Sequence, residues 1–125
     1  MSDSESTVPA TRSPYIHQRL RVYHVALEFC RTVKIVRGGL PRGLSSIGDQ
    51  LTRAAQSMCL NLAEGAASRH RAVKLRHWGI VAGSASECAA ALDLLEIEDA
   101  APAAVLGRAR QQLHQATVMT LAMMR

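Results

Sequence analysis

The sequence predicts an all-α protein and, within that class, an antiparallel up-down-up-down four-helix bundle. Hydrophobic residues make up 48% of the 125-residue chain but aromatic residues only 3%, so Ala, Leu, Val and Met must build the core. These residues favour helices. Apolar positions recur at steps of three and four, the helical period, and long alternating β-branched runs are missing. A chain of this length is expected to form one domain with a substantial core.

The first 17 residues are expected to form a disordered tail, because they are rich in Ser, Thr and Pro and carry no apolar stripe. The bundle domain then covers 18–125. The first helix is expected from about Arg19 to Val36, and Gly38, Gly39 and Pro41 are suited to end it. Its stripe comprises Val22, Ala26, Phe29, Val33 and Val36.

Three further helices are expected, at about 46–67, 69–96 and 102–124, with Ser68 as the N-cap of the third and Pro102 in the first turn of the fourth. Their stripes comprise Ile47, Leu51, Ala54, Met58 and Leu62, then Trp78, Val81, Ala85, Cys88, Leu92 and Leu95, and finally Leu106, Ala109, Leu113, Ala116, Thr120 and Met124. Short connections between long helices favour antiparallel neighbours.

The third and fourth helices carry long uncharged stretches. Glu87 is the only charged residue between Gly79 and Leu92, and residues 115–124 carry no charge. A helix that is apolar nearly all round is buried on more than one side. The sequence therefore predicts self-association through these helices. The alternative is a small, Ala-rich face that tolerates water.

Several pieces of the sequence carry a resemblance to a known family. They are Leu20-x-Val22-Tyr23-x-x-Ala26, Pro41, Gln50-Leu51-x-Arg53-Ala54-Ala55-x-Ser57, Asn61-Leu62-Ala63-Glu64-Gly65 and Ala82-Gly83-Ser84-x-x-Glu87. In this order they resemble the bacterial four-helix-bundle proteins first known from reading frames inside intervening sequences of large-subunit ribosomal RNA genes. That superfamily includes the accessory (Avd-like) proteins of diversity-generating retroelements.

The resemblance implies more than a fold. It implies a cyclic homo-oligomer, a homopentamer in the best-understood branch, and no enzymatic activity. The retroelement branch binds nucleic acid and a reverse transcriptase, so both are expected partners.

The net charge of +5 and the pI near 9.7 point to a polyanionic partner or simply to a soluble basic protein. On an antiparallel bundle, most of the excess cations gather at one end, which we call the basic pole. The pole consists of Arg19, Arg21, Arg69, His70, Arg71, Lys74, Arg76, His77 and Arg125, with Glu64 as its only helical acid. All but Arg125 are predicted to bind nucleic acid.

A detail of the basic pole favours a phosphate ligand. Arg69, His70 and Arg71 are expected in the first turn of the third helix, where cations oppose the helix dipole. A bound phosphate would reverse the sign of that effect by using the free N–H groups and the Arg side chains. The alternative is a solvated basic helix end. Aromatic residues are too few for base stacking, so we expect salt-dependent contacts to phosphates.

The polar motif residues of the second and third helices are expected to have structural roles. Asn61, Glu64, Ser84 and Glu87 are predicted to form a buried network, and Gly65 and Gly83 to let the helices approach closely. Arg53 belongs to the same motif. A catalytic or metal site is the alternative, but the Glu-x-x-His pattern of diiron bundles is missing.

His70 and His77 lack further metal ligands, so no metal and no cofactor is expected. The odd set of Cys30, Cys59 and Cys88 is expected to serve as small core residues without a disulfide.

Neither a signal peptide nor a membrane-spanning run is seen, so a cytoplasmic location is expected. The sequence thus predicts a non-enzymatic oligomeric protein that binds RNA or DNA through its basic pole and assists a reverse transcriptase or RNA-related machinery. The alternative is a scaffold that binds only protein.

Overall fold

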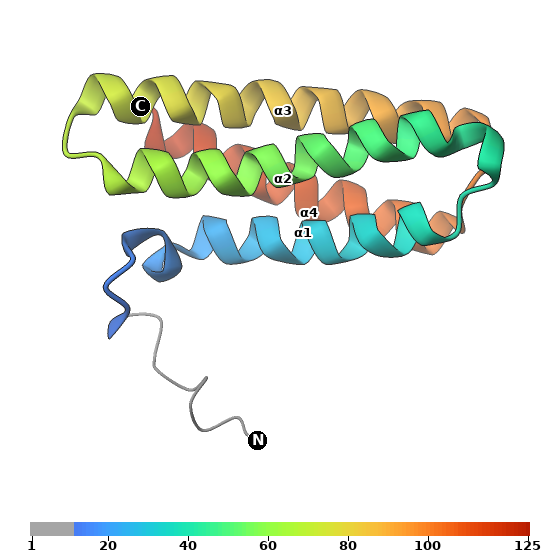
Figure 1. Ribbon diagram of the computed structural model, residues 1–125, viewed down its shortest axis with the longest axis horizontal. Coiled ribbons are helices and arrows are strands. Elements are labelled where there is room, and N and C mark those ends of the chain that lie inside the picture. The colour runs from blue at the N-terminus through green and yellow to red at the C-terminus, as the bar shows by residue number, and fades with distance from the viewer. Residues whose placement is uncertain (1–11) are drawn as a thin grey trace.

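The computed structural model describes residues 12–125, and within this part all regular structure is helical. The four α-helices are α1 (Arg21–Gly38), α2 (Ser45–Ala67), α3 (Arg71–Ile97) and α4 (Ala103–Met123). Two short 3-10 helices, η3 (Ile16–Arg19) and η4 (Arg42–Leu44), precede α1 and α2. The long helices lie side by side in an elongated bundle (Figure 1). The all-α prediction is confirmed.

The core runs along the length of the bundle, where α2 packs on α3, α1 packs on α2 and α4, and α3 packs on α4. The predicted stripes form this core. Phe29, Leu51, Met58, Leu62, Leu92 and Leu95 are among its largest fully buried side chains. Ile47 and Met124, at the ends of their stripes, are only partly buried. Burial of these apolar side chains contributes roughly 1.5–3 kcal/mol each and is the main force that holds the helices together.

The start of α3 differs from the prediction. The helix begins at Arg71, so Arg69 and His70 lie in the connection that precedes it. Ser68 is the C-cap of α2, and its Oγ accepts a hydrogen bond from the backbone N–H of His70 at 3.1 Å. The prediction of Ser68 as the N-cap of α3 is therefore wrong, because its hydroxyl stabilises the connection instead.

The segment before α1 contacts the bundle from Ser13 onward, whereas residues 1–11 of the predicted tail lie outside the described residues. Ser13 is buried, and its Oγ donates to Gln18 Oε1 at 2.6 Å. Arg19 Nε donates to the carbonyl oxygen of Ser13 at 2.9 Å. These contacts stabilise the segment around η3, which packs against α2 and α1, and His24 Nε2 lies 2.8 Å from the carbonyl oxygen of Gln18.

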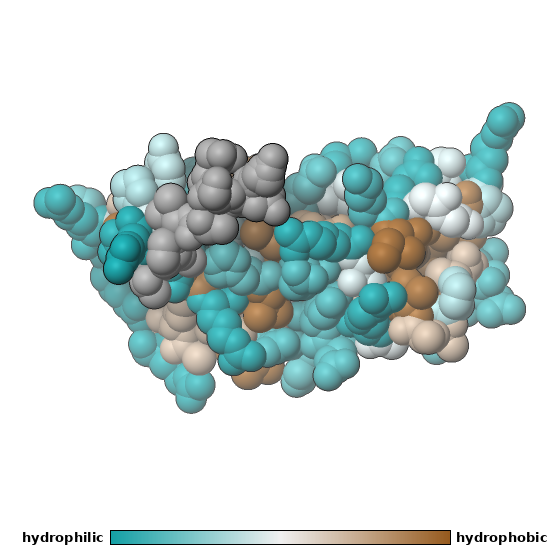
Figure 2. Space-filling view, turned by 90° about the horizontal axis from the view of Figure 1, so that it is seen from below, coloured by the Kyte–Doolittle hydropathy of each residue, from teal (hydrophilic) through white to brown (hydrophobic). Residues whose placement is uncertain are grey.

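Apolar side chains also reach the surface, and Figure 2 shows some of them on the face that α1 covers. On α3 a line of mostly apolar residues, interrupted by Glu87, follows helical spacing, and we call it the α3 outer stripe. It consists of Ile80, Gly83, Glu87, Ala90, Leu94 and Ile97, all exposed. Leu94 is 49% and Ile97 78% exposed. None of the helices in the described range is long and apolar enough to cross a membrane.

Candidate nucleic-acid interface

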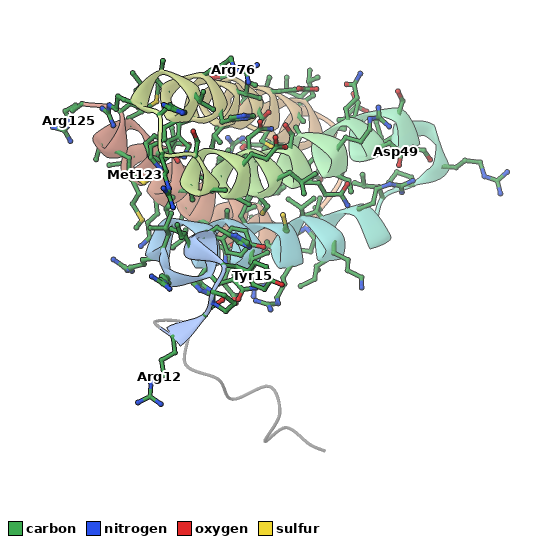
Figure 3. All side chains as sticks on the ribbon, turned by 60° about the vertical axis from the view of Figure 1, so that its left-hand side comes forward. Arg12, Tyr15, Asp49, Arg76, Met123 and Arg125 are labelled. Carbon is green, nitrogen blue, oxygen red and sulfur yellow. The ribbon has the colours of Figure 1, made fainter. Side chains whose placement is uncertain are left out.

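The basic pole is one physical end of the bundle, at the left of Figure 1. Arg71, the first residue of α3, donates from Nη1 to the carbonyl oxygen of Met123 at 3.0 Å and from Nη2 to that of Arg125 at 2.8 Å. The end of α4 therefore lies beside the start of α3. Figure 3 shows Arg125 and Asp49 toward opposite ends of the molecule.

Lys74 joins α3 to the end of α2. Its Nζ donates to the carbonyl oxygens of Gly65 and Ala66 at 3.1 and 3.3 Å, and it lies 5.4 Å from the centroid of the Trp78 ring. Carbonyl groups at a helix C-terminus lack partners within the helix and attract cations. Lys74 and Arg71 thus have internal capping roles that the sequence analysis did not assign to them.

Other cations of the pole are free to meet a ligand. The side chains of Arg21, Arg69, Arg76 and Arg125 have no hydrogen bond or ion pair to any described residue, and all four residues are exposed. Figure 3 shows Arg76 directed outward from α3. These four guanidinium groups keep all their donors available to solvent.

At the opposite end of the bundle, Arg37 and Arg110 are paired with carboxylates, whereas Arg42 and Arg108 are exposed and have no ion pair among the described residues. Arg110 forms ion pairs with Asp93 at 3.0 Å and Glu96 at 2.7 Å, and Arg37 with Asp49 at 3.0 Å. The hydrogen bond with Glu96 raises the pKa of Arg110. No Arg or Lys of the basic pole has such a carboxylate partner among residues 12–125. Glu64 is the only helical acid at the pole, whereas the opposite end carries Asp49, Asp93, Glu96, Glu98 and Asp99, so the net positive charge lies at the pole.

His77 was predicted to contact nucleic acid, but the structure places it between α2 and α3. Its side chain is only 12% exposed, and Nδ1 lies 3.0 Å from Asn61 Oδ1. Asn61 Nδ2 donates to the backbone oxygen of Ser57 at 2.9 Å, which fixes the orientation of the amide. Asn61 Oδ1 is then an acceptor, so His77 Nδ1 must carry a proton. Nε2 lies 3.8 Å from Glu64 Oε2.

The polar network predicted around Asn61 exists with different members. Asn61 Nδ2 also lies 3.2 Å from Ser57 Oγ, which accepts a hydrogen bond from Ser84 Oγ at 3.0 Å. Ser57 and His77 are members that the sequence did not predict, Glu64 lies at the edge of the network beside His77, and Glu87 makes no contact with it. The Glu64 and Glu87 side chains are exposed, as is Arg53.

A sequence signal for this pairing did exist. Asn61 and His77 lie eight residues before and after Arg69, near the middle of the connection. Gly65 and Lys74 lie almost equally far from it on either side. Consecutive helices joined by a short connection bring such positions together.

The two motif glycines, Gly65 and Gly83, differ in the space around them. A Cβ on Gly65 would come within 2.6 Å of Trp78 Nε1, so the close approach predicted there is present, and the indole ring fills it. A Cβ on Gly83 would meet nothing within 4 Å. Gly83 therefore has no such role toward the rest of the described chain. Trp78 is buried, and its Nε1 has no hydrogen-bond partner among the described residues.

The cysteines are free thiols, as predicted. Cys59 and Cys88 are buried in the core, whereas Cys30 is only partly buried. The Sγ atoms of Cys30 and Cys59 lie 3.5 Å apart across α1 and α2, a juxtaposition that the sequence analysis missed. Within residues 12–125 the structure contains no group of three or more His, Cys, Asp or Glu side chains arranged to hold a metal ion.

Fold and surface together define a small all-helical protein with one strongly basic end. The model of the family described as 23S rRNA-intervening sequence protein matches residues 18–121. The chain therefore belongs to this family, which confirms the resemblance carried by the motifs. No curated protein matches the chain.

Proposed function

We propose that this protein is a non-enzymatic accessory factor that holds the phosphate backbone of a nucleic acid at its basic pole. The observation that supports it best is the excess of cations without acidic partners at the basic pole. Arg37 and Arg110 are paired with carboxylates, whereas Arg21, Arg69 and Arg76 are exposed and have no acidic partner in the described chain. Unpaired arginines present planar donors suited to phosphate oxygens.

The start of α3 adds further donors to the proposed interface. Its N-cap, His70, makes no side-chain cap, and the first turn contains no acidic residue. The first backbone N–H groups of a helix point outward and favour an anion. Arg69 lies just before this turn and Arg76 in the next one, so both exposed guanidinium groups belong to the same end of α3 as the free N–H groups.

The proposed function includes self-association of the protein. We infer an antiparallel up-down-up-down bundle that self-associates through the α3 outer stripe into a cyclic homo-oligomer, with five copies as the resemblance suggests. Exposed Leu94 and Ile97 support a covered surface there. Gly83 supports it as well, since a helical glycine destabilises by about 0.5–1 kcal/mol relative to Ala yet leaves room for another chain. Repetition of the basic pole around a ring would sum weak contacts.

A matched pair of double variants tests the nucleic-acid interface. Arg69→Glu with Arg76→Glu removes two free cations of the pole, and Arg42→Glu with Arg108→Glu makes the same change of charge at exposed positions elsewhere. Arg71 and Lys74 are left intact because they cap helices. Binding to labelled structured RNA and to duplex DNA is measured at low and at physiological salt.

We expect the wild type and the Arg42/Arg108 variant to bind with a steep salt dependence, since each phosphate contact contributes a slope of about −0.9 on duplex DNA. The Arg69/Arg76 variant should bind far more weakly and with a shallower slope. Equal binding by the two variants would contradict an interface at the pole.

The same binding experiment decides between a nucleic-acid-binding factor and a protein scaffold. If the wild type binds no nucleic acid even at low salt, the protein is instead a scaffold that binds only protein. The exposed α3 outer stripe favours this role in that case. Leu94→Glu should then dissociate the oligomer, as measured by light scattering, while Leu60→Glu at an exposed position on α2 serves as the comparison. A reverse transcriptase or RNA-related machinery is the partner that the resemblance suggests for either role.

A further inference from the structure

A groove between α1 and α2 lies apart from the basic pole and contains a thiol. Its volume is about 360 Å³, and Cys30 lines it together with Arg31, Lys34 and Arg37 from α1 and Thr52 and Gln56 from α2. A volume of this size is within the range of small-molecule sites, which begins at about 300 Å³. Cys30 is the only partly exposed cysteine of the three.

We propose that this groove receives small disulfides of negative charge and that Cys30 exchanges with them to form a mixed disulfide. The proposal is independent of nucleic-acid binding. It rests on a thiol at the wall of a groove, a second thiol in contact with it, and a cationic rim.

The second thiol belongs to Cys59, whose Sγ lies 3.5 Å from that of Cys30. As the donor, the Cys59 S–H group stabilises a thiolate at Cys30. This hydrogen bond lowers the pKa of Cys30, although partial burial opposes the effect. When protonated, Cys30 can donate to the carbonyl oxygen of Ala55 at 3.5 Å. The thiolate is the reactive form in disulfide exchange.

The charged side chains at the rim of the groove, Arg31, Lys34 and Arg37, determine which disulfide reagents are preferred. Arg31 pairs with Glu28, and Arg37 pairs with Asp49 at 3.0 Å. Lys34 is exposed and has no acidic partner among the described residues, so it leaves the rim with a net positive charge. No charged side chain of α2 lines the groove itself. Carboxylate-bearing disulfides should therefore be preferred over cationic ones.

The exchange is a single balanced step. Cys30 loses its proton to solvent, and its sulfur attacks one sulfur of the reagent R–S–S–R. The S–S bond of the reagent breaks, a Cys30–S–S–R bond forms, and the other half leaves as RS⁻ and takes up a proton. Cys30 is oxidised to the disulfide level, and the leaving half is reduced to a thiol.

The step should stop at the mixed disulfide. Before the exchange, the hydrogen bond with Cys30 and burial both raise the pKa of Cys59. Burial persists once Cys30 is in the adduct, so Cys59 is expected to stay protonated and to be a poor nucleophile at neutral pH. Cys59 is a positioning residue that acts through the thiolate of Cys30.

Oxidised glutathione, which is anionic, and cystamine, which is cationic, are the two probes. The intact protein is incubated with each, and peptide mass spectrometry follows the rate and position of modification. We expect a stable glutathione adduct on Cys30 and none on Cys59 or Cys88. Lys34→Glu should lower the ratio of the glutathione rate to the cystamine rate by at least about threefold. Arg108→Glu, an equal charge change elsewhere, should leave the ratio unchanged.

The role of Cys59 is tested by the pH profile of the reaction. Cys59→Ala should shift the pH at which the modification rate rises to a higher value. Cys59→Ser, which keeps a donor, should return that pH to the wild-type value, and Cys88→Ala should not change it. A Cys30–Cys59 disulfide in place of the adduct would overturn the role of Cys59. The site would be overturned if Cys30 reacted no faster than buried Cys88. It would also be overturned if Lys34→Glu left the ratio of the glutathione rate to the cystamine rate unchanged.

Discussion

The Nζ of Lys74 lies 3.1 Å from the carbonyl oxygen of Gly65, and this contact ties the first turn of α3 to the last turn of α2. The α-hydrogen of Gly65 leaves space for the Trp78 ring, over which Lys74 also lies. A cation from the basic pole therefore stabilises the connection between two helices. Its effect on stability can be separated from any effect on binding.

Replacement of Lys74 by Met should lower the free energy of unfolding by about 1 kcal/mol, because two C-terminal carbonyls of α2 lose their donor. Arg76→Met removes the same charge from an exposed side chain without a described partner and should change stability by less than about 0.5 kcal/mol. Urea unfolding at one protein concentration measures both. Equal losses would show that net charge, and not capping, is responsible.

Gly65→Ala should destabilise the protein by about 1–3 kcal/mol, because the new Cβ would lie 2.6 Å from Trp78 Nε1 and 2.9 Å from Cδ1. Alanine normally stabilises a helix interior relative to glycine. Gly107→Ala provides the control, since nothing lies within 4 Å of its Cβ, and it should be neutral or stabilising. Thermal unfolding and the emission of the single Trp report on both variants. An unperturbed Trp signal in Gly65→Ala would contradict the close packing.

The helices and their buried faces could be predicted from the sequence because apolar periodicity and core burial have the same physical cause. Phe29, Met58 and Leu92 fall on the predicted stripes and are fully buried. Helix ends were predicted less well. Ser68 has the chemistry of an N-cap, but a hydroxyl can serve either of two adjacent elements, and here it stabilises the connection.

The candidate site could be predicted only as a set of charges. Arg69 and Arg76 follow from composition and helix order, but the capping roles of Arg71 and Lys74 depend on which carbonyls lie opposite them. His77 was predicted on the basic surface because it lies near the start of the third helix, at the basic pole. Its burial depends on the rotation of α3 against α2, which helical periodicity at the end of a stripe does not determine.

Asn61→Ala should lower the free energy of unfolding by roughly 1–3 kcal/mol, since Ser57 loses a donor and the half-buried His77 loses an acceptor. Nucleic-acid binding by the folded variant should be retained, because Asn61 does not face the free arginines. Gln50→Ala, at an exposed position on the same helix, should be nearly neutral. Chemical unfolding compares the two. Unchanged stability in Asn61→Ala would refute the structural role of the network.

Cys88 should make the protein less stable as the solution becomes alkaline. Burial, together with Cys30 and Glu87, raises the pKa of this thiol from 9.0 to about 12. Between these values the unfolded chain has lost a proton that the folded protein keeps, so the free energy of unfolding falls as pH rises. The contribution is fully present below pH about 9, and the slope per thiol is about 1.4 kcal/mol per pH unit.

Cys88→Ala removes the contribution of this thiol to the pH dependence of the free energy of unfolding. The contributions of Cys59 and Tyr23 remain, because neighbouring groups and burial also raise their pKa values. Urea unfolding from pH about 8 to about 10.5 should show a shallower decline in the variant than in the wild type, although the variant starts from a lower stability because it leaves a small cavity. Parallel declines would mean that the Cys88 thiol ionises in the folded core as readily as in the unfolded chain.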